Sequence, residues 1–185
     1  MKLSKLQRLF FLVIPSLLVG FGGGILQANA AEKVVIKAGF HQASIPLEDL
    51  QNFAETGQVS PALEDILSAS KSDSERTRQA LTKEVPVNLV WADKALNHPL
   101  GEMLLDQISV VIHPPTTTAN RAALRSAIVL SAGEDNQVSL LEIIENYPAS
   151  ELHIEGERIV EASEKLGRLS QGVKEAMRKI PDIFR

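Results

Sequence analysis

Helix start and stop signals recur so closely in this sequence that they dictate short helices. Gly57 is placed to end one amphipathic segment, because glycine readily adopts the left-handed conformation that closes a helix. Ser60 and Pro61 then form an N-cap and first-turn pair for the next segment. Further breaks stand at Pro86, Pro99, Pro114, Gly133 and Pro148. A chain divided in this way is expected to fold from many short helices.

The segments between these breaks have apolar residues at helical spacing. The first two helices carry them on one face each: Leu47, Leu50, Phe53 and Ala54, then Ala62, Leu63, Ile66 and Leu67. Capping signals mark three other helix starts, at Ser72 with Glu75 (before residues 76–84), at Asn88 (before 89–96) and at Ser139 with Glu142 (before 140–144). Two more helices are predicted over residues 99–112 and 119–132, joined by a stiff loop.

Three segments are predicted to be β-strands. Residues 32–39 form a β-branched run ended by glycine, and residues 42–45 could return as its hairpin partner. Residues 151–156 are a further candidate, which could pair with the first strand and tie the ends of the domain together.

The last predicted helix, over residues 157–180, is the longest. Apolar residues recur along it with a spacing of three and four: Ile159, Ala162, Leu166, Leu169, Val173, Ala176 and Ile180. Such a seam can serve a coiled coil or a partner helix, but we expect it to pack on the domain's own core. Gly167 and Gly172 weaken the helix. The predicted fold is therefore mainly α, a compact bundle of seven or eight short helices with a small two- or three-stranded β-sheet.

The first thirty residues have the pattern of a signal peptide. Basic residues precede an apolar stretch over residues 9–26, and Ala28-Asn29-Ala30 supplies the small residues of a cleavage site. An uncleaved membrane anchor is the alternative, since about 18 apolar residues approach the length that spans a bilayer. We expect cleavage after Ala30 and export to the periplasm or another extracytoplasmic compartment. The mature chain is then a single helical domain of residues 31–185 with no stable membrane span.

Composition excludes several classes of protein and partner. The chain has no cysteine, which excludes a disulfide framework and a lipidated amino-terminal cysteine. Beyond residue 30, 16 basic and 23 acidic side chains give a formal charge of −7. Nucleic acids and anionic membranes favour clustered lysine and arginine, so neither is an expected partner.

No segment has the pattern of a serine nucleophile. The hydrolase elbow needs Gly-x-Ser-x-Gly on a strand-to-helix turn, and the nearest approach has Val129 where the first glycine belongs. Ser131, Asp135 and His153 follow one another in the hydrolase order, but Ser131 ends a helix pattern instead of opening one. We assign no catalytic residue.

Metal and cofactor signals are also weak. The four histidines are far apart in the sequence: His41, His98, His113 and His153. No two share a pattern that places metal ligands on one element, although they could still converge in space. The two glycine-rich patterns that bind nucleotide phosphates, Gly-x-x-x-x-Gly-Lys and Gly-x-Gly-x-x-Gly, do not occur. We therefore assign no nucleotide, cofactor or metal.

The order of these segments resembles a known family, the cyanobacterial domain of unknown function 1400, an exported module catalogued with α/β-hydrolases. The most diagnostic segments are "DLQNFAETG", "HPLGEMLL" and "LLEIIENYP" followed by "LHIEG". In that family the module often precedes a hydrolase domain, and we expect none in this chain, whose sequence stops at Arg185 where such a domain would begin. The resemblance implies no functional residue that can be carried over.

We therefore expect an exported, non-catalytic binding or interaction module. Its helices would offer an apolar groove to an unknown protein partner or to an apolar, acyl-type ligand. The alternative is an accessory or regulatory component of a hydrolase, acting in trans on a separate enzyme.

Overall fold

The computed structural model describes residues 33–88, 94–116, 120–133 and 135–179. The predicted signal peptide lies outside the described residues. The helix predicted after Asn88 lies largely outside them too, and only its last residues, 94–96, are described, as helix.

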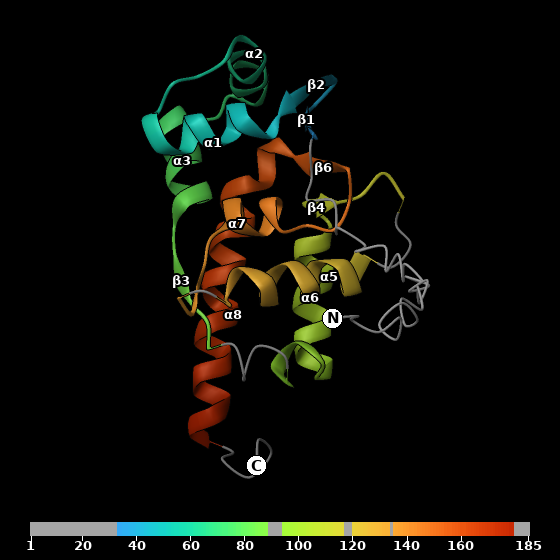
Figure 1. The fold of residues 1–185 in the computed structure, drawn as a ribbon, viewed down its shortest axis with the longest axis vertical. Coiled ribbons are helices and arrows are strands. Elements are labelled where there is room, and N and C mark those ends of the chain that lie inside the picture. Colours follow the sequence, from blue (N-terminus) through green and yellow to red (C-terminus); the bar gives the residue numbers. More distant parts are fainter. Residues whose placement is uncertain (1–32, 89–93, 117–119, 134, 180–185) are drawn as a thin grey trace, which may run out of the picture.

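Seven other α-helices have their bounds within the described ranges. They are α1 (Leu47–Thr56), α2 (Pro61–Ser70), α3 (Ser74–Thr82), α5 (Pro99–Ser109), α6 (Asn120–Ser131), α7 (Leu140–Glu145) and α8 (Ile159–Lys179). A short 3₁₀ turn at Gly156–Arg158 precedes α8. The prediction of a mainly α fold is confirmed. Figure 1 shows α8 running along the molecule, with α1, α2 and α3 gathered at one end.

The β-structure is larger than the predicted two or three strands. Its strands are β1 (Lys33–Ala38), β2 (His41–Pro46), β3 (Val85–Pro86), β4 (Ile112–His113), β5 (Gln137–Val138) and β6 (Glu151–Glu155). Four of them form one sheet in the order β2-β1-β6-β4, and β3 pairs with β5 in a second, two-stranded sheet.

The predicted strand pairings within the larger sheet are confirmed. β1 and β2 form an antiparallel hairpin, and β6 lies parallel to β1 on its other side, with Lys33 opposite Glu151. The strand β4 was missed, because the predicted helix over 99–112 extended too far. α5 ends at Ser109, and Ile112 instead pairs with Ile154 of β6.

Two of the predicted helix boundaries are reproduced in detail. Gly57 follows α1 with φ 78°, and its N–H donates to the Phe53 carbonyl. Ser139 and Glu142 form a reciprocal capping box at the start of α7. The box predicted at Ser72 is wrong, because Asp73 is the N-cap of α3 and accepts from the Arg76 N–H.

A continuous apolar core joins the sheet to the helices. One face of the sheet contributes Val34, Ile36, Ile45, Ile112, Leu152 and Ile154, all of them buried. The first residues of the α8 seam, Ile159, Ala162 and Leu166, are buried in the same core. Every helix within the described ranges lacks the length or the apolar character needed to cross a bilayer.

Candidate functional site

The face of the four-stranded sheet that points away from the core is polar. Leu152 and Ile154 of β6 are buried in the core. Because successive side chains of a strand point to opposite faces, the remaining three residues of β6 lie on the other face: Glu151, His153 and Glu155.

The strand register extends this arrangement across the sheet. One row, from β2 to β4, consists of Ser44, Val35, His153 and His113. On either side of it, Lys33 lies opposite Glu151 and Lys37 opposite Glu155. We call the six titratable side chains the polar sheet face: Lys33, Lys37, His113, Glu151, His153 and Glu155.

Glu151 is the centre of one half of the polar sheet face. Its carboxylate lies 2.6 Å from Lys33 Nζ and 2.9 Å from His153 Nε2. The hydrogen bond with Lys33, followed by that with His153, lowers the pKa of Glu151. An ionised carboxylate only accepts hydrogen bonds, so His153 Nε2 carries the proton and its Nδ1 keeps a lone pair when the ring is neutral.

His113 is held in the opposite tautomer. Its Nδ1 lies 2.9 Å from the Pro114 carbonyl oxygen, which can only accept, so Nδ1 carries the proton. Its Nε2 therefore has the lone pair in the neutral ring and lies 3.7 Å from a Glu155 carboxylate oxygen. The centroids of the His113 and His153 rings are 5.7 Å apart. When both rings are neutral, the polar sheet face thus offers two adjacent imidazole acceptors.

This arrangement can bind polar groups more readily than it can perform acyl transfer. The Glu151–His153 pair has the orientation of an acid that positions a base, but a nucleophile must lie next to that base. Ser44 shares the row, but Val35 separates it from His153 and is only 4% exposed. In the part of the chain that is described, no three acidic or histidine side chains are grouped so as to hold a metal ion.

Ser131 lies in the last turn of α6 and serves a structural role. Its Oγ donates to the Ala127 carbonyl at 2.9 Å and accepts from Asn146 Nδ2 at 3.2 Å. The side chain is buried, with the residue 4% exposed. This hydroxyl therefore joins α6 to the end of α7, where a substrate carbonyl has no access to it.

Asp135 and His153, the other residues weighed from the sequence as a triad, bond to partners other than Ser131. Asp135 accepts from the Gln137 N–H in the connection between α6 and β5. His153 has Glu151, and not Asp135, as its carboxylate partner. His41 is the exposed first residue of β2, and His98 immediately precedes α5.

Sequence reasoning missed the approach of His113 to His153. The alternation of Glu151, His153 and Glu155 does indicate a polar strand face. The partner strand β4 is only two residues long, which is too short for an alternating pattern in the sequence to predict it.

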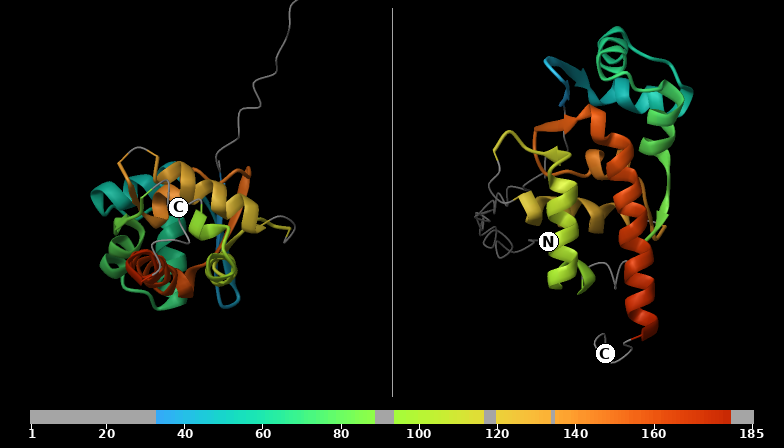
Figure 2. Two further views of the ribbon diagram at one scale, coloured as in Figure 1. Left: turned by 90° about the horizontal axis from the view of Figure 1, so that it is seen from below. Right: turned by 180° about the vertical axis from the view of Figure 1, so that it is seen from behind.

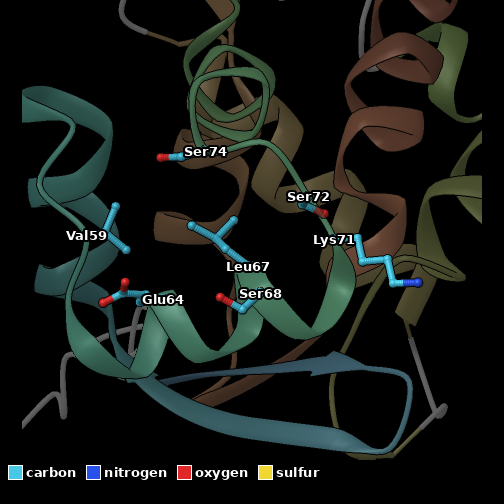
Figure 3. Close-up of a pocket in the computed structure, with 7 residues that line it drawn as sticks. All are labelled: Val59, Glu64, Leu67, Ser68, Lys71, Ser72 and Ser74. Atoms are coloured by element: carbon cyan, nitrogen blue, oxygen red, sulfur yellow. The ribbon is translucent and has the colours of Figure 1, made fainter.

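A separate surface hollow of about 390 Å³ lies beside α2 (Figure 3). It is lined by Val59, Glu64, Leu67, Ser68, Lys71, Ser72 and Ser74. Val59 and Leu67 are its only apolar lining side chains, whereas a bound acyl chain needs apolar contact along its length. This lining suits a small polar group better than a fatty acyl chain.

Comparison with known proteins places most of the chain in one family. The family model described as "Alpha/beta hydrolase of unknown function (DUF1400)" matches residues 30–155. The matched segment runs to the last residue of β6, and α8 follows it. The chain matches no curated protein and no solved structure.

Proposed function

The chain belongs to the DUF1400 family, which is described as alpha/beta hydrolase of unknown function, and within that family we propose that it is an exported, non-catalytic module that binds a protein partner. The observation that carries the proposal is the placement of Ser131. Its hydroxyl is buried and holds two helices together, whereas a nucleophile needs an accessible oxygen beside a base.

The polar sheet face is the surface through which we propose that the partner binds. It combines two imidazole acceptors with carboxylate and ammonium groups, and its side chains are neither fully buried nor fully exposed. Groups of this kind confer specificity on an interface because an unmatched partner leaves them without hydrogen bonds.

Two alternatives remain open. The first is an accessory or regulatory component of a hydrolase, acting in trans on a separate enzyme; its support is that the family description connects the chain with hydrolases. An apolar, acyl-type ligand is the other, although the hollow beside α2 lacks the apolar lining that such a ligand needs.

Capture with the mature protein tests the binding proposal. The bait is residues 31–185, offered to the exported fraction of the source organism, with mass spectrometry of proteins and lipids together. We expect the unmodified bait to enrich one protein, and we expect a His113→Ala/His153→Ala bait to capture none of it. A His41→Ala variant should retain it, because His41 lies on the opposite face of the sheet.

The molecule that is captured distinguishes the proposed function from the two alternatives. Enrichment of a hydrolase supports the accessory role, and enrichment of lipid alone supports an acyl ligand. Equal capture by all three baits contradicts binding through the polar sheet face.

Export is tested by intact mass. The basic start, the apolar stretch and Ala28-Asn29-Ala30 support cleavage after Ala30. The exported protein should begin at Ala31. A full-length species in the membrane would instead support the uncleaved anchor.

A further inference from the structure

We propose that the outer edge of β2 joins two copies of this chain into one continuous sheet. β2 lies at the margin of the four-stranded sheet and pairs on one side only, with β1. Over the described ranges, no backbone hydrogen bond reaches its other edge. Figure 2 shows the β1–β2 hairpin at the margin of the molecule, away from α8.

The register identifies the backbone groups that this edge offers. The hairpin is closed by two residues, Gly39 with φ 58° and Phe40, so that Ala38 pairs with His41 next to the turn. Pairs that exchange both hydrogen bonds alternate with pairs that exchange none. Gln42 and Ser44 therefore point their N–H and C=O groups away from β1.

The β2 edge lacks the features that usually prevent strand addition. Natural edge strands are commonly protected by lysine, by an internal proline, by a bulge or by being very short. β2 has six residues and no charged side chain, its register with β1 is unbroken, and its single proline is the last residue. The opposite edge strand, β4, is protected by its length of two residues.

The occupant that fits this edge is a second copy, because the edge is complementary to itself. In an antiparallel pair with two-fold symmetry about Ala43, Gln42 faces Ser44 of the second copy, and both exchange backbone hydrogen bonds. Pro46, which has no N–H, then faces Phe40 of the second copy and needs only to accept. No like charges meet, since this segment has none.

Phe40 gives a second reason for this pairing. Its side chain is fully exposed at the tip of the hairpin, with an exposure of 108%. In the two-fold register the ring lies beside Pro46 of the second copy, which is also exposed. Pairing therefore covers an aromatic ring that the single chain leaves in water. Because β4 is too short to accept a further strand, association ends at two copies.

A cysteine at the symmetry axis tests the register, since the chain has no cysteine of its own. Cα atoms opposite each other in a pair without hydrogen bonds are about 4.5 Å apart, within the range that a disulfide bridges. The mature Ala43→Cys protein should form a disulfide-linked dimer under mild oxidation. A Gln171→Cys variant, exposed on α8, should stay monomeric under the same conditions.

Charged substitutions on β2 test the proposed pairing of the two β2 edges without a crosslink. A Gln42→Lys/Ser44→Lys variant places lysine opposite lysine at two pairs, and a Gln42→Glu/Ser44→Glu variant does the same with glutamate. By light scattering we expect a dimer for the unmodified mature chain, monomers for each variant alone, and a dimer when the two are mixed. A Gln107→Lys/Gln171→Lys variant, which changes the charge equally on α5 and α8, should remain a dimer.

A monomeric unmodified chain would overturn the proposal, and so would a dimer that survives both edge variants. Crosslinking of Ala43→Cys to another protein would assign the edge to a different partner and would also overturn it. Self-association does not depend on the proposed function, because ester turnover and partner capture are read from separate experiments.

Discussion

Gly101 and Gly156 leave no room for a side chain, and both lie in segments by which the sequence resembles its family. A Cβ on Gly101 would lie 2.0 Å from the Ala95 carbonyl oxygen, and one on Gly156 would lie 2.9 Å from Ile36. The first glycine lets α5 pass close to the backbone of Ala95 and Leu96. The second lets the chain pass β1 as it turns into α8. The resemblance thus follows packing requirements, which explains why it identifies a family better than an activity.

Gly101→Ala is expected to destabilise the fold. The added methyl meets backbone atoms that cannot move aside, so the free energy of unfolding should fall by about 3 kcal/mol or more. The control is Gly167→Ala in α8, where a Cβ meets nothing within 4 Å. That variant should gain about 0.5–1 kcal/mol, because alanine favours a helix over glycine. Urea unfolding of both variants measures the contrast, and equal effects would contradict it.

Tyr147, the only tyrosine of the chain, should make stability depend on alkaline pH. Burial raises its pKa from 10.0 to about 12, and its hydroxyl donates to Asn120. Between these values the unfolded state loses the phenolic proton that the folded state keeps, so stability falls as pH rises from 10 to 12. The loss is about 2–3 kcal/mol.

Phenolate absorbance reports this residue alone. Native protein should titrate near pH 12 and urea-unfolded protein near pH 10. The free energy of unfolding of a Tyr147→Phe variant should not show the decrease between pH 10 and 12 that we attribute to the phenol. A native titration near pH 10 would show that the phenol is accessible to water.

At the scale of elements, the sequence predicted most helix boundaries because the capping chemistry is local. It failed between α2 and α3, where the residue predicted to cap the second helix closes the first one instead. Lys71, with φ 52°, and Ser72 close the end of α2, and the Ser72 N–H donates to the Leu67 carbonyl. Ser72 is therefore used as a helix stop, and the cap of α3 passes to Asp73.

This assignment predicts different effects for two neighbouring substitutions. Asp73→Ala should lower the free energy of unfolding by about 1 kcal/mol, because the Arg76 N–H loses its acceptor. Ser72→Ala should change it by less than about 0.5 kcal/mol, since the backbone N–H of that residue forms the bond. Urea unfolding distinguishes them, and the reverse order would restore the predicted capping box.

The candidate site was less predictable than the helices. The alternation of Glu151, His153 and Glu155 indicates a polar strand face. The contact of His153 with His113, however, depends on the pairing of β4 with β6, in which the two histidines are 40 residues apart in the sequence. Val111 and Ile112 continue the apolar period of α5, so a local pattern assigns them to the helix. Only the contact with β6 makes Ile112 a strand residue.

At the scale of the whole molecule, the parallel pairing of β1 with β6 brings the first and last strands together. The apolar core lies on one face of this sheet, with α1 and α2 against the β1–β2 hairpin and α5 against β4, and it leaves the polar sheet face and the β2 edge for contacts. Of the three pairings in this sheet, only one is parallel. Within the described ranges, Ser131 ends a helix, and the strand-to-helix turn that an esterase elbow needs is not formed around it.

Ester turnover by the mature chain tests the central claim, that this module does not catalyse, most directly. Short- and medium-chain nitrophenyl esters are offered to the unmodified protein, to Ser131→Ala and to His153→Ala, each verified as folded by circular dichroism. We predict turnover at the background rate in all three, because Ser131 is buried in a helix contact and the Glu151–His153 pair has no adjacent nucleophile. Turnover above background that is lost in Ser131→Ala or in His153→Ala would contradict the account and make the module an enzyme.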